Sequence, residues 1–152
     1  MPIEALLFRI GSEEYAADAS QVESVLRLPP AWASAPAPQG ADGVAEVNGT
    51  AISVFVPFAL LDLQSMTVTA QTRLIVTYSE TGPKGFVADD VISVVPVDDA
   101  GVKPLPAAIA RETPRWLRGV ITLGDRMLLV LDLCQYVASR ERQMDHDGEV
   151  TP

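Results

Sequence analysis

Residues 43–56 read GVAEVNGTAISVFV, and residues 119–133 read GVITLGDRMLLVLDL. Both stretches begin with Gly-Val, pass through a two-residue turn and end in an apolar run. Asn48-Gly49 between two apolar runs predicts a β-hairpin, because both central residues of a type I′ turn need a positive φ. The arm that follows is apolar on both faces, which is typical of a strand covered on two sides.

The two stretches match each other position by position. When Gly43 is placed over Gly119, the turns nearly coincide and apolar residues fall on apolar residues. The matched pairs are Val44 with Val120, Val47 with Leu123, Ile52 with Leu128, and Val54 with Val130. We interpret this match as a sign of two related β-subdomains that each contribute one hairpin to a shared interior. The alternative is that any two apolar hairpins look alike.

Gly and Pro divide the rest of the chain into short runs. Runs at 5–10, 15–17, 72–78 and 85–88 predict strands, whereas 91–97 fits a strand or a short helix turning into one. A short helix is predicted over 20–28, a helical turn from Pro57, and a further helix beginning near 133–137. Residues 98–114 read as a linker. About nine or ten strands with a few short helices predict an all-β fold of small barrels or a sandwich.

Composition narrows the class of partner. The chain has 152 residues, of which 48% are hydrophobic, so it fits one domain or two small halves sharing a core. A net charge of −9 disfavours binding to nucleic acid and to anionic membrane surfaces. The sequence has no signal-peptide pattern and no apolar run of ~18 residues, the length that a membrane span needs. A cytoplasmic protein is therefore expected.

The sequence offers little evidence of a catalytic site. The only histidine, His146, lies in the polar segment 138–152, which is predicted to be a disordered tail that gives Asp145-His146-Asp147 no fixed metal geometry. No catalytic residue, metal site or cofactor is predicted, and Asp89 is read as a structural hydrogen-bond acceptor. Cys134, the only cysteine, is predicted to be a buried, unreactive thiol.

Trp32 lies in the Pro- and Ala-rich segment 29–42. This large apolar ring gains most free energy from burial, so it is interpreted as an anchor for the loop. An exposed contact for a partner is the alternative.

The order of features resembles the CheW-like coupling domain of bacterial chemotaxis. The resemblance rests on LLFRIGSEEYAADASQVESV at 6–25, GVAEVNGTAISV at 43–54, GFVADDV at 85–91 and WLRGVITLGDRMLLVLDL at 116–133. It implies two SH3-like five-stranded barrels that form a single domain over residues 1–137. It also implies a non-enzymatic adaptor whose partners are a chemoreceptor cytoplasmic tip and the CheW-like regulatory domain of a CheA-type histidine kinase, or variant equivalents. Such an adaptor would be cytoplasmic and could gather at membrane-associated receptor arrays.

The resemblance also implies a partner-binding surface. The positions that it assigns are Val22, Ser24, Val25, Gly43, Val44, Asn48 and Gly49. Plain core packing is the alternative for the three valines. Ser24 and Asn48 stand where the family pattern has Glu and Arg, and losing both charges together leaves neither one unpaired. A second hypothesis is a structural or localisation protein that self-associates, and a small-molecule sensor is a third.

Overall fold

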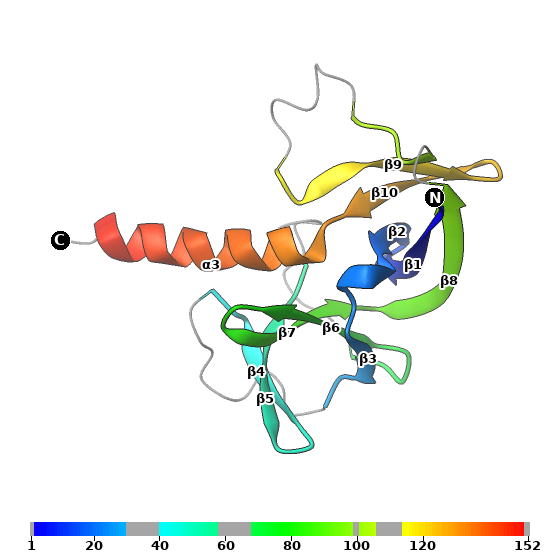
Figure 1. Ribbon diagram of the computed structural model, residues 1–152. Helices are drawn as coiled ribbons and strands as arrows, with labels where there is room; N and C mark the ends of the chain where they lie inside the picture. The colour runs from blue at the N-terminus through cyan, green and yellow to red at the C-terminus, as the bar shows by residue number, and fades with distance from the viewer. Residues whose placement is uncertain (1, 30–39, 58–67, 99–100, 106–113, 151–152) are drawn as a thin grey trace.

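The computed structural model describes residues 2–29, 40–57, 68–98, 101–105 and 114–150. In these residues the chain forms two five-stranded sheets and one long helix, α3 (Figure 1). Sheet A has the order β8-β1-β2-β10-β9, and sheet B has the order β3-β6-β7-β5-β4. The strands are β1 Pro2–Ile10, β2 Glu13–Asp18, β3 Ser24–Arg27, β4 Gly43–Val47, β5 Thr50–Phe55, β6 Arg73–Ser79, β7 Gly82–Ala88, β8 Asp90–Asp98, β9 Leu117–Leu123 and β10 Arg126–Leu131.

The predicted similarity of the two hairpins is confirmed, because their strands pair in the same register. β5 is the equivalent of β10 and β4 of β9, because Gly43 pairs with Val54 as Gly119 pairs with Val130, an offset of 119 − 43 = 76. The turn at Asn48-Gly49 has φ values of 51° and 81°, so both residues adopt the left-handed conformation that a type I′ hairpin requires.

The repeat extends to the other strands with a second offset. Leu74 pairs with Val87 as Ala5 pairs with Asp18, an offset of 74 − 5 = 69, so β6 and β7 repeat β1 and β2. The parallel ladders also correspond, since β2 runs parallel to β10 and β7 runs parallel to β5. The chain is therefore a tandem repeat of β1 to β5 and β6 to β10.

Each half of the chain contributes to both sheets. Sheet A takes β1 and β2 from the first half, and sheet B takes β3, β4 and β5 from it. The second half supplies the remaining strands of each sheet in the same pattern. The sheets thus consist of strands exchanged between the two repeats.

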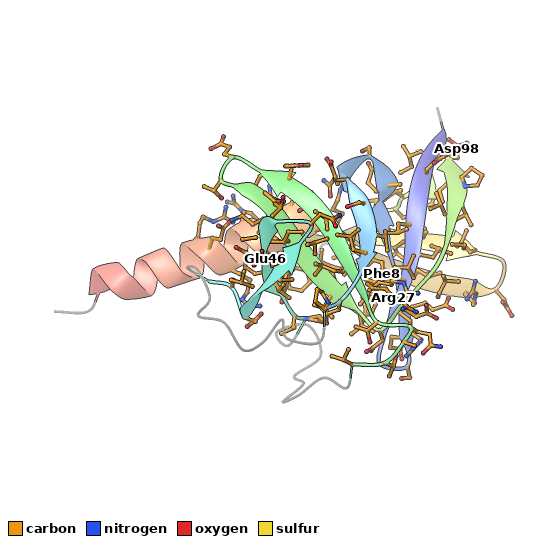
Figure 2. All side chains as sticks on the ribbon, turned by 90° about the horizontal axis from the view of Figure 1, so that it is seen from below. Phe8, Arg27, Glu46 and Asp98 are labelled. Atoms are coloured by element: carbon orange, nitrogen blue, oxygen red, sulfur yellow. The ribbon has the colours of Figure 1, made fainter. Side chains whose placement is uncertain are left out.

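Three apolar clusters fill the interior. One lies inside sheet A around Leu128, and one lies inside sheet B around Val54. A central cluster joins the two sheets to α3 around Phe8, which Figure 2 labels among the side chains between the strands. Its rings meet edge to face, with centroids 5.9 Å apart for Phe8 and Phe86 and 5.2 Å apart for Phe86 and Tyr136. This central cluster makes the two sheets one packed unit.

The two repeats pack differently at Gly85. An added Cβ on Gly85 would lie 2.4 Å from Cδ1 of Leu74, whereas the equivalent positions in sheet A hold Ala16 and Ala5. We expect Gly85→Ala to lower the free energy of unfolding by about 1–2 kcal/mol through overpacking. The loss should shrink in a Leu74→Ala background, which recreates the alanine pair. Urea unfolding of the double-mutant cycle measures this coupling, and additive losses would contradict it.

The predicted helix over 20–28 is wrong. Only Ala19–Gln21 form a helical turn, of the 3-10 type, and Ser24–Arg27 form β3. β3 pairs with β6, and the Glu23 N–H donates to the Val76 carbonyl at 2.7 Å. The segment was too short to distinguish the two periods, and pairing satisfies the backbone edge of β6. The alternative of a helix at 91–97 is also excluded, because this segment belongs to β8.

The predicted disordered tail is also contradicted. Helix α3 spans Leu133–Val150, and Figure 1 shows its C-terminal part projecting beyond the sheets. Gln, Arg, Glu and Met are good helix formers, and the contacts of Arg140 with residues near β5 anchor the helix. Among the described residues, no helix is both long and apolar enough to cross a bilayer.

Two residues in the segments that connect strands, Lys103 and Asp89, make specific hydrogen bonds. In the predicted linker, Lys103 pairs with Val120 through two backbone hydrogen bonds of 2.9 Å, which covers the outer edge of β9. Asp89 acts as the predicted structural acceptor, since its Oδ2 receives the Gly11 N–H at 2.6 Å. The predictions for Trp32 and for most of the helical turn from Pro57 fall outside the described residues.

Candidate partner-binding surface

Three predicted site residues lie at the β3 edge of sheet B. Val22 precedes β3 and packs, half-buried, against the central cluster. Ser24 is half-buried opposite Val76, and Val25 lies opposite the buried Ile75. Val25 keeps 37% of its surface exposed, so plain core packing does not describe it. It lies where the central cluster reaches the surface.

The other predicted residues lie at the opposite edge of the same sheet. Gly43 is buried and Val44 half-buried on β4, and Asn48 and Gly49 form the exposed turn between β4 and β5. The strand order β3-β6-β7-β5-β4 places three strands between β3 and β4. Strand pairing therefore does not bring the two groups of predicted residues together.

The repeat identifies further surface residues that the sequence reasoning missed. Val94 on β8 is the equivalent of Val25, since 94 − 25 = 69, and it lies opposite the buried Leu6. Val94 is 50% exposed and Ile92 is 44% exposed. The signal was present as Val-x-Ser-Val at both 22–25 and 91–94. We call Val25, Ile92 and Val94 the apolar rim, because they are exposed on β3 and β8, the edge strands of the two sheets.

The apolar rim lies away from the helix. In Figure 1, β3 and β8 lie on the side of the molecule opposite the projecting end of α3, and Figure 2 places the labelled Arg27 and Asp98 on that side too. Exposed branched apolar side chains on two edge strands are unusual for a solvated surface and are typical of contact sites.

A groove adjoins the predicted β3 residues. It has a volume of about 310 Å³ and lies between the 3-10 turn, β6 and α3. Its lining includes Val22, the 57% exposed Tyr78, and Cys134. Tyrosines that expose an apolar ring together with a hydroxyl are common in protein interfaces.

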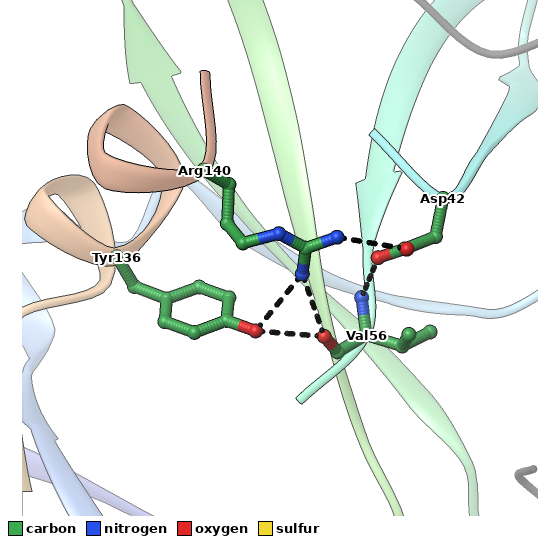
Figure 3. A network of polar contacts seen from close by, with 4 residues as sticks. All are labelled: Asp42, Val56, Tyr136 and Arg140. Carbon is green, nitrogen blue, oxygen red and sulfur yellow. Dashed lines mark hydrogen bonds and ion pairs between the residues drawn. The ribbon is translucent and has the colours of Figure 1, made fainter. Parts of the chain in front are cut away.

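A network of polar contacts fixes α3 against the β4–β5 hairpin (Figure 3). Asp42 accepts from the Val56 N–H at 2.9 Å and from Arg140 Nη2 at 2.8 Å. The Tyr136 hydroxyl donates to the Val56 carbonyl at 2.8 Å, and Arg140 Nη1 donates to the same carbonyl at 3.2 Å. We call these four residues the helix clasp.

The helix clasp is built for structure rather than proton transfer. Burial raises the pKa of the Tyr136 hydroxyl, despite the opposing charge of Arg140. Burial lowers the pKa of Arg140, but the hydrogen bond to Asp42, the neighbouring Tyr136 hydroxyl and the charge of Asp42 together more than compensate, so this pKa lies above its usual value. Both groups therefore keep their protons at neutral pH, and neither is tuned as a general acid or base.

Cys134 lies on the first turn of α3 and is half-buried. Burial, followed by the charge of Asp132, raises the pKa of its thiol, and a hydrogen bond with Thr77 opposes the shift. We expect Cys134 to react with a disulfide reagent at pH 7.5 about tenfold more slowly than a free thiol, because only the thiolate attacks. Absorbance of the released thiol measures the rate. An equal rate in the folded protein would contradict this prediction, and denaturant should remove the difference.

Within the described part of the chain, no three His, Cys, Asp or Glu side chains gather where they could hold a metal ion. The predicted site residues are apolar or small and offer no nucleophile paired with a base. The arrangement is suited to contact with another protein surface.

Comparison with known proteins agrees with this architecture. The family model of the CheW-like domain matches residues 4–141. The chain is 24% identical to the chemotaxis protein CheW of Rhizobium meliloti (strain 1021) over 140 residues, which cover 92% of this chain and 90% of that protein. It is 25% identical to the CheW of Klebsiella aerogenes over 138 residues, covering 91% and 83%. The crystal structure of the scaffolding protein TtCheW from Thermoanaerobacter tengcongensis matches with a TM-score of 0.68 and 20% identity, covering 88% of this chain and 86% of that one.

The fold is thus a two-sheet fold with SH3-like subdomains, as the sequence predicted. Because the family model covers nearly the whole chain, the chain belongs to the CheW-like domain family.

Proposed function

We propose that this protein is a non-enzymatic adaptor of bacterial chemosensory signalling, which couples a chemoreceptor to a CheA-type histidine kinase. Membership of the CheW-like family supports this role, and relatives named as chemotaxis proteins and as a scaffolding protein agree with it. The observation that carries the proposal is the apolar rim, three exposed branched side chains held on two rigid sheets beside the central cluster. The adaptor acts in the cytoplasm as a single domain that includes the anchored part of α3, without a cofactor.

The β3 residues fit this role more readily than the β4 residues. Val22 lines the groove beside Tyr78, and Val25 belongs to the apolar rim. Gly43 and Val44 lie on the far edge of sheet B and are buried or half-buried. We therefore propose the β3 and β8 edges as the contact for one partner, and the β4 edge with its Asn48-Gly49 turn as a separate contact.

The direct test measures binding of the purified protein to a receptor cytoplasmic tip and to the CheW-like domain of a CheA-type kinase. Calorimetry should show micromolar or tighter affinity for at least one of them. Binding to neither would refute the coupling role. A concentration-dependent oligomer in sedimentation without either affinity would support the self-association hypothesis instead.

Substitutions at Ser24 and Asn48 test whether this chain is a variant of the family pattern. We expect Ser24→Glu combined with Asn48→Arg to raise the affinity for the receptor tip or the kinase domain. Asn48→Arg should also cost about 1 kcal/mol of stability, because a non-glycine, non-Asn residue is strained at the φ of 51° found there. Asn48→Asp, which tolerates this conformation, is the matched control. Unchanged affinities would show that these positions do not face either partner.

A further inference from the structure

The pairing of the strands divides into two kinds. Four of the eight ladders join consecutive strands in hairpins, namely β1–β2, β4–β5, β6–β7 and β9–β10. The other four ladders, β1–β8, β2–β10, β3–β6 and β5–β7, each join a strand of the first half to a strand of the second half. Neither half therefore contains a ladder that would link its own hairpin strands into a larger sheet.

The apolar clusters follow the same division. The cluster inside sheet B combines Val54 from the first half with Leu74 and Val87 from the second. The cluster inside sheet A combines Leu7 with Leu128 in the same way. The central cluster brings Phe8 against Phe86. A two-stranded hairpin is marginally stable in water by itself, so each half depends on the other for its folded form.

The two halves are joined by one covalent connection. The first half ends at Pro57 and the second begins at Val68, with ten residues, 58–67, between them. All four ladders between the halves, and the three clusters, are formed by non-covalent contacts across this division. They can be formed equally well by the first half of one molecule and the second half of another.

We propose that a second copy of this chain is a partner, through exchange of whole halves. In the exchanged dimer the first half of each molecule pairs with the second half of the other, and two complete domains result. The tether of ten residues sets an effective concentration on the order of millimolar for the halves of one molecule. The monomer therefore dominates at micromolar concentration, and the dimer forms when chains fold together near millimolar concentration.

A disulfide between two different copies detects the exchange. Glu4 and Pro96 are Cα partners across the β1–β8 ladder, and both side chains are exposed. Facing residues of an antiparallel pair lie about 4.5–5.5 Å apart, within the range of a disulfide. One copy carries Glu4→Cys and the other carries Pro96→Cys, and both carry Cys134→Ser to remove the native thiol. The two copies are unfolded together in guanidinium, refolded at about 1 mM, and oxidised with oxidised glutathione.

The expected product is a disulfide-linked heterodimer of twice the 16.3 kDa chain mass, with the circular dichroism of the monomer. Refolding at about 1 μM should lower its yield at least tenfold. Glu4→Cys mixed with Thr122→Cys is the matched control, because Thr122 is exposed on β9, which β2 and β10 separate from β1. A dimer formed only by surface contact would not favour the Glu4–Pro96 pair over this control.

A single chain carrying both Glu4→Cys and Pro96→Cys is the positive control for the geometry of the bond. If this chain forms the disulfide and the mixed copies never do at about 1 mM, the exchange is refuted. Equal yields from the Glu4–Pro96 and Glu4–Thr122 mixtures would refute it as well.

Discussion

Replacing Asp42 by alanine is expected to lower the free energy of unfolding by about 2–3 kcal/mol. The substitution leaves the N–H of the fully buried Val56 without its acceptor. It also removes the anion that pairs with the half-buried guanidinium of Arg140. An unsatisfied buried donor and an unpaired, partly buried charge are each costly, so this one carboxylate should matter more than a surface acid.

The matched control is Glu14→Ala. Glu14 pairs with Arg126, but this ion pair is largely exposed, with 54% of the Arg126 side chain accessible against 19% for Arg140. Its loss should change stability by less than about 1 kcal/mol. Urea unfolding followed by circular dichroism measures both variants. Similar losses for Asp42→Ala and Glu14→Ala would show that the helix clasp is no stronger than a surface pair.

Replacing Val94 by aspartate is expected to weaken binding of the partner that contacts the apolar rim by about 30-fold, or ~2 kcal/mol. A charge placed in an apolar contact loses its water on binding and gains no partner there. Val94 is already 50% exposed, so the free protein should keep its fold and its unfolding midpoint. Val25→Asp, at the equivalent position of the other sheet, should act in the same direction.

Met127→Asp is the control for this experiment. Met127 is 73% exposed on β10, away from the β3 and β8 edges. Titration calorimetry with the receptor tip and the kinase domain compares the three variants. If Met127→Asp weakens binding as much as Val94→Asp, or if neither rim variant changes any affinity, the apolar rim is not the contact surface.

Local patterns predicted the hairpins well but not the pairing between them. The Asn48-Gly49 turn and the Gly43–Gly119 correspondence were readable, because turn chemistry and alternation are properties of neighbouring residues. The exchange of strands between the two halves was not predicted, since partners such as Leu6 and Val94 are far apart in sequence. Apart from Val-x-Ser-Val, the repeat of β1 to β3 in β6 to β8 has too few identities to be noticed.

The surface residues divide in the same way, into those that the local sequence reveals and those whose exposure depends on strands far away in the chain. The sequence pattern led to Val22, which lines the groove and packs against the central cluster, and to Val25, which lies opposite Ile75 of that cluster. It missed Val94 because exposure on an edge strand depends on which strands lie beyond it in the sheet. The helix predicted over the nine residues 20–28 was wrong for a related reason. A short run fits a helix and a strand equally well, and the open edge of β6 decides between them.

The pairing of every hairpin with the opposite half also affects synthesis on the ribosome. When β1 to β5 have emerged, the nascent chain holds hairpins whose ladder partners have not yet been made. Sheet B can close only after β7 appears, and sheet A only after β10 takes its place parallel to β2. At about 5–20 residues per second, the first half stays exposed for several seconds. Its apolar strands are therefore open to aggregation until β10 has emerged.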